Sequence, residues 1–522
     1  MNGFIQHHGS SVMGMLNGFD RLRFRGTLRW LCYAGGLGRY LSAIGVRLTQ
    51  FKEFTQAMTA QVRESIEGVA RRAGRPVEYL ASPSISKEAY ARGIAERDGI
   101  REGLIAVLYA VEPCRSFRIG LDKGTGCIEV ENALRKCAHY YSYWMDPVWG
   151  FSHVRVQTWF PMTVHVYVNG REWLSRQMDR AGIAYYRREN CFVWVENVKR
   201  VQGLLDRQLK IDWETSLSRL LQRSHPKYRR ILGLPKTLGY YWSADESEWA
   251  SDVMFRSAAL LRGLYPRLIA HGMQGMGSRE VLRFLGRHVP AHGGVRGSFH
   301  GEVTTDLRER PEGMRIKHRV KANSIKMYDK QGSVLRVETT INDTQDFRVF
   351  RAKEGQPRGG KRWLPLRKGV ADLHRRAVIS QAANTRYLES MAAVETKTPL
   401  GELMRQLCQP VRWKAGRVRA LNPLADADAR LLETVNRGEF AVNGFRNRDL
   451  RDRLCVRTSD PAVLKKQSAA ITRQLRLLRA HGLIRKVSTT HRYVLSKKGQ
   501  TAITALLVAR AADTSTLAGT AA

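Results

Sequence analysis

The sequence has no long apolar run, and this absence bears on where the protein resides. No stretch reaches the roughly 18 consecutive apolar residues that a transmembrane helix needs. The first segment carries His7, His8 and several glycines instead of the apolar core of a signal peptide. No basic helix shows the bulky aromatic face of a membrane-surface anchor. We therefore expect a cytoplasmic protein with no membrane partner.

Cysteine is also scarce, and its spacing argues against cysteine-based sites. The chain has 7 cysteines in 522 residues, an odd number, and none of them form a CxxC pair. Such a set is typical neither of a disulfide framework nor of the common zinc-binding motifs. We interpret these cysteines as reduced thiols and predict no metal site from them. P-loop, metalloprotease and nucleophile-elbow motifs are absent as well.

Acidic residues are few compared with basic ones. The 47 Asp and Glu residues face 87 Lys and Arg residues, which gives a formal net charge of +40. A high-GC genome favours Arg over Lys, but it does not explain an excess of bases over acids. Such an excess calls for either a polyanionic partner or a heavy counterion atmosphere. Because no feature points to a membrane, we expect nucleic acid, and hence a nucleoid-associated protein.

The length and the hydrophobic periodicity predict a multidomain α+β protein. We expect a helical N-terminal region followed by a central mixed α/β sheet region. Within this central region, residues 153–209 read as strand, strand, helix, strand, strand, helix, and 249–264 reads as a helix. The predicted regions are 1–125 (mostly helical), 126–225 (a small α/β unit), 226–410 (a helical segment, a β-meander and a basic loop) and a C-terminal domain over 411–512.

The C-terminal region has the most specific pattern. Three helices are predicted over residues 426–436, 447–454 and 462–481, followed by a basic hairpin and a closing helix over 496–508. With the segments HGLIRK and RYVLSKKG, this order resembles the winged-helix family of bacterial DNA-binding proteins over residues 412–510. The resemblance implies a helix-turn-helix whose third helix enters the major groove.

Charge in this region agrees with the resemblance. On the third helix, away from its apolar stripe, Arg and Gln can bond base edges, and Lys can neutralise phosphate. A winged helix used for protein contacts is the alternative. The predicted duplex-DNA contacts are Lys465, Lys466, Gln467, Ser468, Thr472, Arg473 and Arg476 on the helix, and Arg485, Lys486, His491 and Arg492 on the hairpin.

The predicted meander has two chemically different faces. Strands are expected over 314–320, 324–328 and 334–341. Their alternation directs one apolar set towards a core: Ile316, Ile325, Met327, Leu335 and Val337. The opposite face is basic and either lies along a nucleic-acid backbone or is simply solvated. It carries Arg315, Lys317, Arg319, Ser324, Lys326, Tyr328, Arg336 and Glu338.

The segment IKMYDK…VLRVET, within residues 325–338, resembles a K-x-Y-x-K…R-x-E stretch of phage and plasmid replication initiator proteins. Those enzymes nick DNA with a tyrosine and hold the new end as a phosphotyrosine. The resemblance implies Tyr328 as nucleophile, Lys326 and Lys330 beside the phosphate, and Glu338 near a divalent metal, Mg or Mn. The chain departs from that pattern because it lacks a histidine-apolar-histidine triplet.

A transposase-like nuclease would instead need dispersed carboxylates. Candidates are Asp20, Asp146, Asp306 and Glu338, and each also reads as an ordinary structural or surface acid.

Aromatic residues cluster between Tyr140 and Phe151, beside a strand that carries His153 and Arg155. Aromatic rings among basic side chains suit single-stranded DNA or RNA. A buried aromatic core explains the same cluster equally well.

These observations favour a DNA-binding protein with a C-terminal winged helix, associated with a mobile element, whose basic body also contacts nucleic acid. A replication-initiator-like or transposase-like nuclease is one alternative, and a transcriptional regulator is another. The high basic charge argues against a regulator, because ligand-sensing domains are rarely so basic.

Overall fold

The computed structural model describes most of the chain between residues 3 and 511. The positions left out within that range are 125, 236–237, 275, 277–280, 283, 287–302, 311–312, 354–355, 357–359, 393–399, 414–415, 438–439, 441–443 and 488–489.

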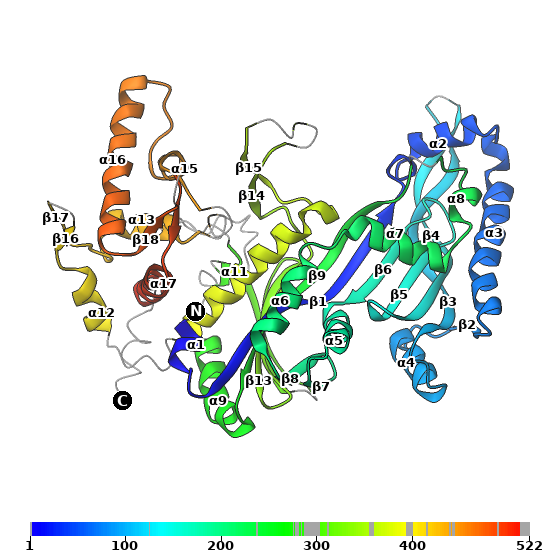
Figure 1. The fold of residues 1–522 in the computed structure, drawn as a ribbon. Helices are drawn as coiled ribbons and strands as arrows, with labels where there is room; N and C mark the ends of the chain where they lie inside the picture. The colour runs from blue at the N-terminus through cyan, green and yellow to red at the C-terminus, as the bar shows by residue number, and fades with distance from the viewer. Residues whose placement is uncertain are drawn as a thin grey trace.

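One large mixed sheet forms the body of the molecule, which is a mixed α+β structure (Figure 1). Its pairs are antiparallel except for the parallel pair at the β2 edge. In spatial order the strands are β10 (Val303–Arg310), β11 (Gly313–Val320), β12 (Asn323–Lys330), β13 (Val334–Ile341), β9 (Tyr241–Phe255), β1 (Val12–Thr27), β6 (Val164–Asn169), β5 (Gly150–Gln157), β4 (Ile128–Asp146), β3 (Gly103–Leu121) and β2 (Val77–Tyr79).

Helices cover the apolar face of this sheet at both of its ends. On α3, Met58, Val62 and Ile66 are buried, as their helical spacing predicts, and this helix packs on β3 and β4. At the other end, α9 and α11 bury their apolar sides against β11–β13. The helices of the body are α1 (Gly3–His7), α2 (Ala34–Ala43), α3 (Phe51–Arg72), α4 (Lys87–Arg97), α5 (Gly170–Arg180), α6 (Val198–Gln208), α7 (Trp213–Ser224), α8 (Tyr228–Ile231), α9 (Ala258–Gln274) and α11 (Leu373–Ala392), with short 3-10 turns η1 (Arg29–Leu31), η2 (Leu48–Gln50) and η3 (Val370–Asp372).

Two small hairpins lie beside this sheet. The hairpin β7 (Tyr185–Arg188)–β8 (Cys191–Val195) follows α5. The hairpin β14 (Arg348–Arg351)–β15 (Arg362–Pro365) forms part of the predicted basic loop, and Arg358 of that loop lies outside the described residues. Trp363 of β15 contacts Phe440 of the C-terminal region, with ring centroids 5.6 Å apart. This contact links the C-terminal region to the β14–β15 hairpin.

The C-terminal region has a hydrophobic core of its own, centred on Leu431, Leu450, Ile471, Leu478 and Ile503. The elements follow the predicted order of three helices, a hairpin and a closing helix. They are α12 (Leu400–Leu407), β16 (Val411–Trp413), β17 (Gly416–Val418), α13 (Asp426–Val435), α15 (Asn447–Leu454), α16 (Pro461–Ala480), β18 (Ile484–Lys486), β19 (Tyr493–Leu495) and α17 (Lys497–Ala511).

The elements predicted for the α/β unit and for the meander are confirmed, including which meander face meets the core. The prediction of a helix over 249–264 was wrong, because β9 runs through Phe255 and α9 begins at Ala258. A strand covered on both faces shows no alternation, so its sequence can read as a helix. The N-terminal region also contains two long strands, β1 and β3, and strands from all three predicted body regions share one sheet.

In the described part of the chain, we find no helix that combines the length and the apolar character needed to cross a lipid bilayer.

Two helical glycines near β1 give a test of this packing. A Cβ on Gly170, the first residue of α5, would lie 2.1 Å from the Phe19 carbonyl oxygen of β1, whereas a Cβ on Gly203 of α6 would meet nothing within 4 Å. We expect Gly170→Ala to lower the free energy of unfolding by about 1–3 kcal/mol through overpacking. Gly203→Ala, the matched control, should raise it by up to about 1 kcal/mol. Chemical denaturation measures both, and equal effects would contradict the described contact.

Candidate active site and nucleic-acid interface

The polar face of the sheet contains a site built around a β-bulge in β1. Phe19 pairs with Trp249 and Leu22 pairs with Ser247, so Asp20 and Arg21 together lie opposite the single residue Glu248 of β9. A bulge of this kind changes where a side chain points. Here Asp20 is buried beside Glu248 and near Glu338 of β13.

Three carboxylates meet at this point. One oxygen atom from each of Asp20, Glu248 and Glu338 lies within 4.8 Å of the other two, and all three residues are buried. We call these residues, together with Lys326 and Tyr328 of β12, the carboxylate site. Carboxylate oxygens in this arrangement are the ligands that Mg²⁺ and Mn²⁺ prefer. The described part of the chain therefore offers a place for a divalent cation here.

Tyr328 is hydrogen-bonded directly to the carboxylate site. Its hydroxyl donates to Glu338 Oε2 over 2.8 Å. Lys326 Nζ donates to Glu248 Oε1 over 2.9 Å and also to Glu338 Oε1. The contacts follow from the register, since Lys326 pairs with Glu338 across β12 and β13. Tyr328 is two residues along the same face.

Below these residues lies a completely buried arginine. Arg336 donates to Asp252 Oδ1 over 2.5 Å, to Asp20 Oδ2 over 2.8 Å and to the Asn190 carbonyl over 2.8 Å. Asn190 belongs to the β7–β8 hairpin, which thus covers this part of the face. The expectation that Arg336 lies on a nucleic-acid surface was wrong, because it has no exposed surface at all. The alternation of a strand predicts which face of the sheet a side chain lies on. It does not predict which other segments of the chain cover that face.

Opposite charges lie close together at the site. The carboxylates of Asp20, Glu248, Asp252 and Glu338 are buried. The cations that pair with them are Arg21, Arg171, Lys326 and Arg336, and the buried Lys330 lies 5.8 Å from the centre of the Tyr328 ring. Burial, followed by the nearby Glu338 carboxylate, raises the pKa of Glu248. Burial also acts to raise the pKa of Glu338, but Lys326 and Arg336 outweigh it and lower that pKa. The surroundings of the site therefore push the pKa values of these two carboxyl groups in opposite directions.

Tyr328 is held as a neutral phenol in this environment. Burial, followed by the Glu338 carboxylate, raises the pKa of Tyr328 well above its usual value. The hydroxyl therefore stays protonated and donates a hydrogen bond to Glu338. A positive charge added nearby would favour its ionisation.

The carboxylate site opens into a cavity of about 590 Å³. Its floor is the sheet, and its walls come from α4, α5 and the β7–β8 hairpin, including Arg92, Glu172, Arg187 and Asn190. A second cavity of about 850 Å³ lies over β1, β4, β5 and β6. We call it the basic cavity, because five arginines line it against two carboxylates: Arg21, Arg23, Arg25, Arg115 and Arg155, with Asp245 and Glu246.

The two cavities are adjacent. Arg21 and Tyr167 line both of them. His153 and Arg155, which the sequence predicts as nucleic-acid contacts, line the basic cavity, and His153 stacks on Tyr167 with ring centroids 5.3 Å apart. Arg155 also donates to Glu112 over 2.8 Å. The aromatic cluster before them is largely core, since Tyr140, Tyr143, Trp144, Trp149 and Phe151 are buried.

Two of the four acids considered for a dispersed triad come together, and two do not. Asp20 and Glu338 belong to the carboxylate site, whereas Asp146 pairs with Arg223 over 2.5 Å, and Asp306 with Arg315 over 3.3 Å. The third member is Glu248, which sequence reasoning missed because its strand was read as the approach to a helix. On the meander, Arg319 is exposed, while Arg315 and Lys317 are half-buried.

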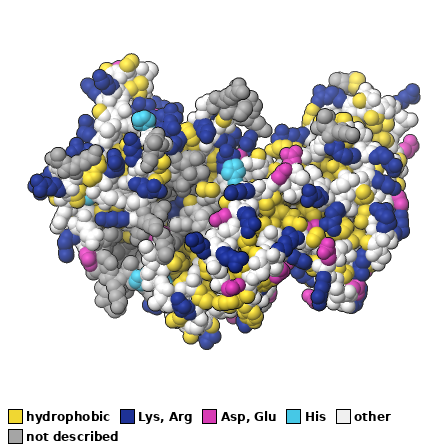
Figure 2. All heavy atoms as spheres, in the orientation of Figure 1, with side chains coloured by type: hydrophobic (Ala, Val, Ile, Leu, Met, Phe, Trp, Pro, Cys, Tyr) yellow, Lys and Arg dark blue, Asp and Glu magenta, His cyan; other side chains and the backbone are white. Residues whose placement is uncertain are grey.

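Most of the predicted C-terminal contacts are exposed. On α16 these are Lys465, Lys466, Thr472, Arg473 and Arg476, and near the hairpin they are Arg485, Lys486 and His491. The others make contacts within the protein. Gln467 donates to the Val456 carbonyl over 2.9 Å, Ser468 donates to Asn447 over 3.2 Å, and the Arg492 guanidinium lies 4.1 Å from the centre of the Phe350 ring. Figure 2 shows Lys and Arg side chains spread over this whole face of the molecule, with α15 and α16 among the elements they cover.

Comparison of the chain with protein-family models, with curated proteins and with solved structures found no match.

The buried arginine gives a test of the site's construction. We expect Arg336→Met to lower the free energy of unfolding by about 3–5 kcal/mol, because it leaves Asp20 buried without its cation and Asp252 with Arg171 alone. Arg308→Met is the matched control, since Arg308 is 58% exposed and its ion pair with Asp306 spans 3.6 Å. That change should cost about 0–1 kcal/mol. A small effect at Arg336, measured by urea denaturation, would contradict the described network.

Proposed function

We propose that this protein is a DNA-binding enzyme that breaks a phosphodiester bond, with Tyr328 as its nucleophile. The observation that carries the proposal is the hydrogen bond from the Tyr328 hydroxyl to Glu338, one of three carboxylates gathered beside a cavity. A nucleophile within hydrogen-bond reach of a proton acceptor is the arrangement that covalent catalysis requires. The local resemblance to replication initiator proteins leads to the same residue.

The proposed step is balanced without any oxidant or reductant. The Tyr328 oxygen forms a bond to phosphorus while the bond from phosphorus to one sugar oxygen breaks. The tyrosine proton passes to Glu338 and from there, through water, to the departing sugar oxygen. The products are a phosphotyrosine and a free hydroxyl end. Lys326, already at the site, supplies positive charge for the phosphate oxygens.

A divalent cation fits the carboxylate site. Asp20, Glu248 and Glu338 would hold it, and it would supply the positive charge that favours ionisation of Tyr328. The convergence of three buried carboxylates supports a cation in this place. Carboxylates would then do the work that a histidine-apolar-histidine motif does in the initiators that this segment resembles.

The basic cavity provides a path for the strand that carries the scissile phosphate. Arg21, Arg23 and Arg25 alternate along β1, and their side chains are 48–55% exposed. Successive arginines on one strand face match the repeated charge of a nucleic-acid backbone. Because Arg21 lines both cavities, a strand bound along β1 would lead to Tyr328.

In this proposal, the C-terminal region binds duplex DNA. Its core, its helix order and its hairpin suit a winged helix, and the exposed cations of α16 suit the major groove. Gln467 and Ser468 are engaged within the protein, so we assign base and phosphate contact to Lys465, Lys466, Arg473 and Arg476. DNA binding without any chemistry is the alternative to the whole proposal.

Nicking tests the chemistry. With Mn²⁺, the full chain should nick a supercoiled plasmid and become covalently joined to DNA, as seen by a shifted band on a denaturing gel. Tyr328→Phe should form no adduct, and Glu338→Gln should slow nicking by about 10²–10⁴-fold. Chelation of the metal should stop the reaction.

Tyr186→Phe is the matched control, because Tyr186 lies on the β7–β8 hairpin and is 51% exposed. It should nick like the parent. An adduct that survives in Tyr328→Phe would refute the proposed nucleophile, and a parent that nicks no DNA would leave only the binding function.

Duplex binding tests the C-terminal assignment separately. Replacing Lys465 and Arg473 by Ala should weaken binding to duplex DNA and reduce the slope of log affinity against log salt by about 0.9 for each phosphate that is no longer neutralised. Lys52→Ala on α3, across the molecule from α16 (Figure 1), should leave the slope unchanged. Equal slopes for the parent and the double variant would argue against α16 as the DNA-binding surface.

A further inference from the structure

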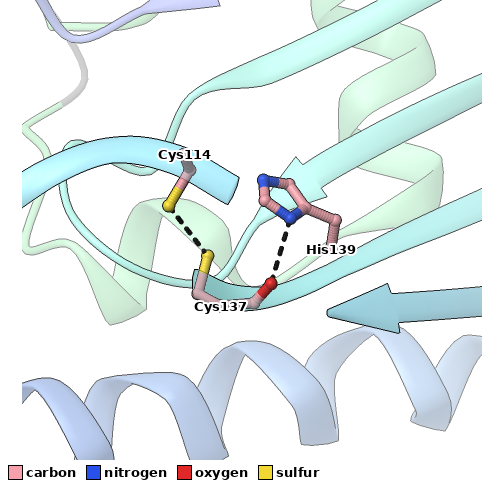
Figure 3. Close-up of side chains that lie close together, drawn as sticks. All are labelled: Cys114, Cys137 and His139. Carbon is pink, nitrogen blue, oxygen red and sulfur yellow. Dashed lines mark hydrogen bonds between the residues drawn. The ribbon is translucent and has the colours of Figure 1, made fainter. Parts of the chain in front are cut away.

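Cys114, Cys137 and His139 come together on the wall of the basic cavity, away from the carboxylate site. Cys137 and His139 are two residues apart on β4 and point to the same face, while Cys114 lies diagonally across on β3 (Figure 3). The two sulfur atoms are 3.4 Å apart. All three side chains are at most 8% exposed, and one ligand atom from each lies within 4.8 Å of the others.

The histidine ring is oriented by the protein. Its Nδ1 lies 3.1 Å from the Cys137 carbonyl oxygen, as Figure 3 shows. A carbonyl oxygen can only accept, so Nδ1 carries the hydrogen and Nε2 is left with a free lone pair. Nε2 is buried and has no hydrogen-bond partner among the described residues. A histidine that donates one N–H to a carbonyl and presents the other nitrogen is the usual form of a metal ligand.

Cationic side chains also lie near the two thiols. Arg155 lines the same cavity as Cys114 and His139, and Arg135 is the strand partner of Cys114 across β3 and β4. Nearby positive charge favours a thiolate, which is the form of cysteine that binds metals. The pair therefore differs from two thiols that merely fill space in a core.

We propose that Cys114, Cys137 and His139 bind Zn²⁺, with a fourth position open to the basic cavity. Zinc prefers two thiolates and an imidazole in this combination, at about 2.3 Å from sulfur and 2.0 Å from nitrogen. Two sulfurs sharing a tetrahedral zinc stand about 3.8 Å apart by that geometry, close to the observed separation. Cys114 and His139 both line the cavity, so the open position would take water or another oxygen ligand from it.

This proposal does not depend on the tyrosine chemistry. The zinc site lies on β3 and β4, whereas the carboxylate site lies on β1, β9, β12 and β13. Soft sulfur ligands select zinc, and hard carboxylates select Mg²⁺ or Mn²⁺. The two sites are thus distinguishable by the metal that each one takes.

Cobalt substitution tests the site in the full chain. After reduction and removal of metals, the parent should take up one equivalent of Co²⁺ into this site and show a thiolate-to-cobalt absorption band, which one equivalent of Zn²⁺ abolishes. Cys114→Ser/Cys137→Ser should show no band, and His139→Ala should bind Co²⁺ more weakly with an altered visible spectrum.

Two matched variants keep the result specific. Cys32→Ser removes another thiol that lines the same cavity, and Glu338→Gln changes the carboxylate site, so both should keep the full band. If the reduced parent showed no thiolate-to-cobalt band, this result alone would overturn the proposal. A band that persists in the double variant would also overturn it. The proposal would also be overturned if Cys114 and Cys137 formed a disulfide and the reduced thiols then bound no metal.

Discussion

Arg336 has no exposed surface, yet its charge must be balanced, and this requirement organises the centre of the molecule. Its guanidinium joins β13 to β9 through Asp252, to β1 through Asp20 and to the β7–β8 hairpin through the Asn190 carbonyl. A buried charge is tolerated only when its partners are present. The four segments are therefore held in one arrangement, and the carboxylate site is a consequence of that arrangement.

The same constraint explains why the site is polar and still ordered. Asp20 accepts from Arg336 and from the side chains of Asn169 and Asn190, so its direction is determined on several sides. Glu248 and Glu338 share the ammonium of Lys326. The result is a cluster of closely spaced opposite charges and one neutral phenol, at the edge of a cavity. Burying charged groups in this way lowers the stability of a fold, and such groups are typical of functional sites.

The polar face of the sheet continues beyond this centre. From the carboxylate site it passes across Arg21 and Tyr167 into the basic cavity, and from there to the cluster of Cys114, Cys137 and His139. Opposite it, apolar residues of the same strands pack under α3, α7, α9 and α11. One sheet thus separates a hydrophobic core from a face that is suited to polyanions. The exposed cations of α16 extend this character to the C-terminal region.

By itself, the sequence determined the elements whose patterns are local. The alternation of β11–β13 and the order of elements from α13 to α17 follow from residues close together in the chain, and both were predicted. It also singled out Tyr328 and Glu338, because both lie in the short segment that resembles replication initiator proteins. Only the tertiary structure brought in Glu248, the bulge at Asp20, the burial of Arg336 and the meeting of Cys114 with His139. These features depend on the pairing of strands that are separated in the sequence. A strand that is buried on both faces shows no alternation of apolar and polar residues, so its sequence does not reveal its partner.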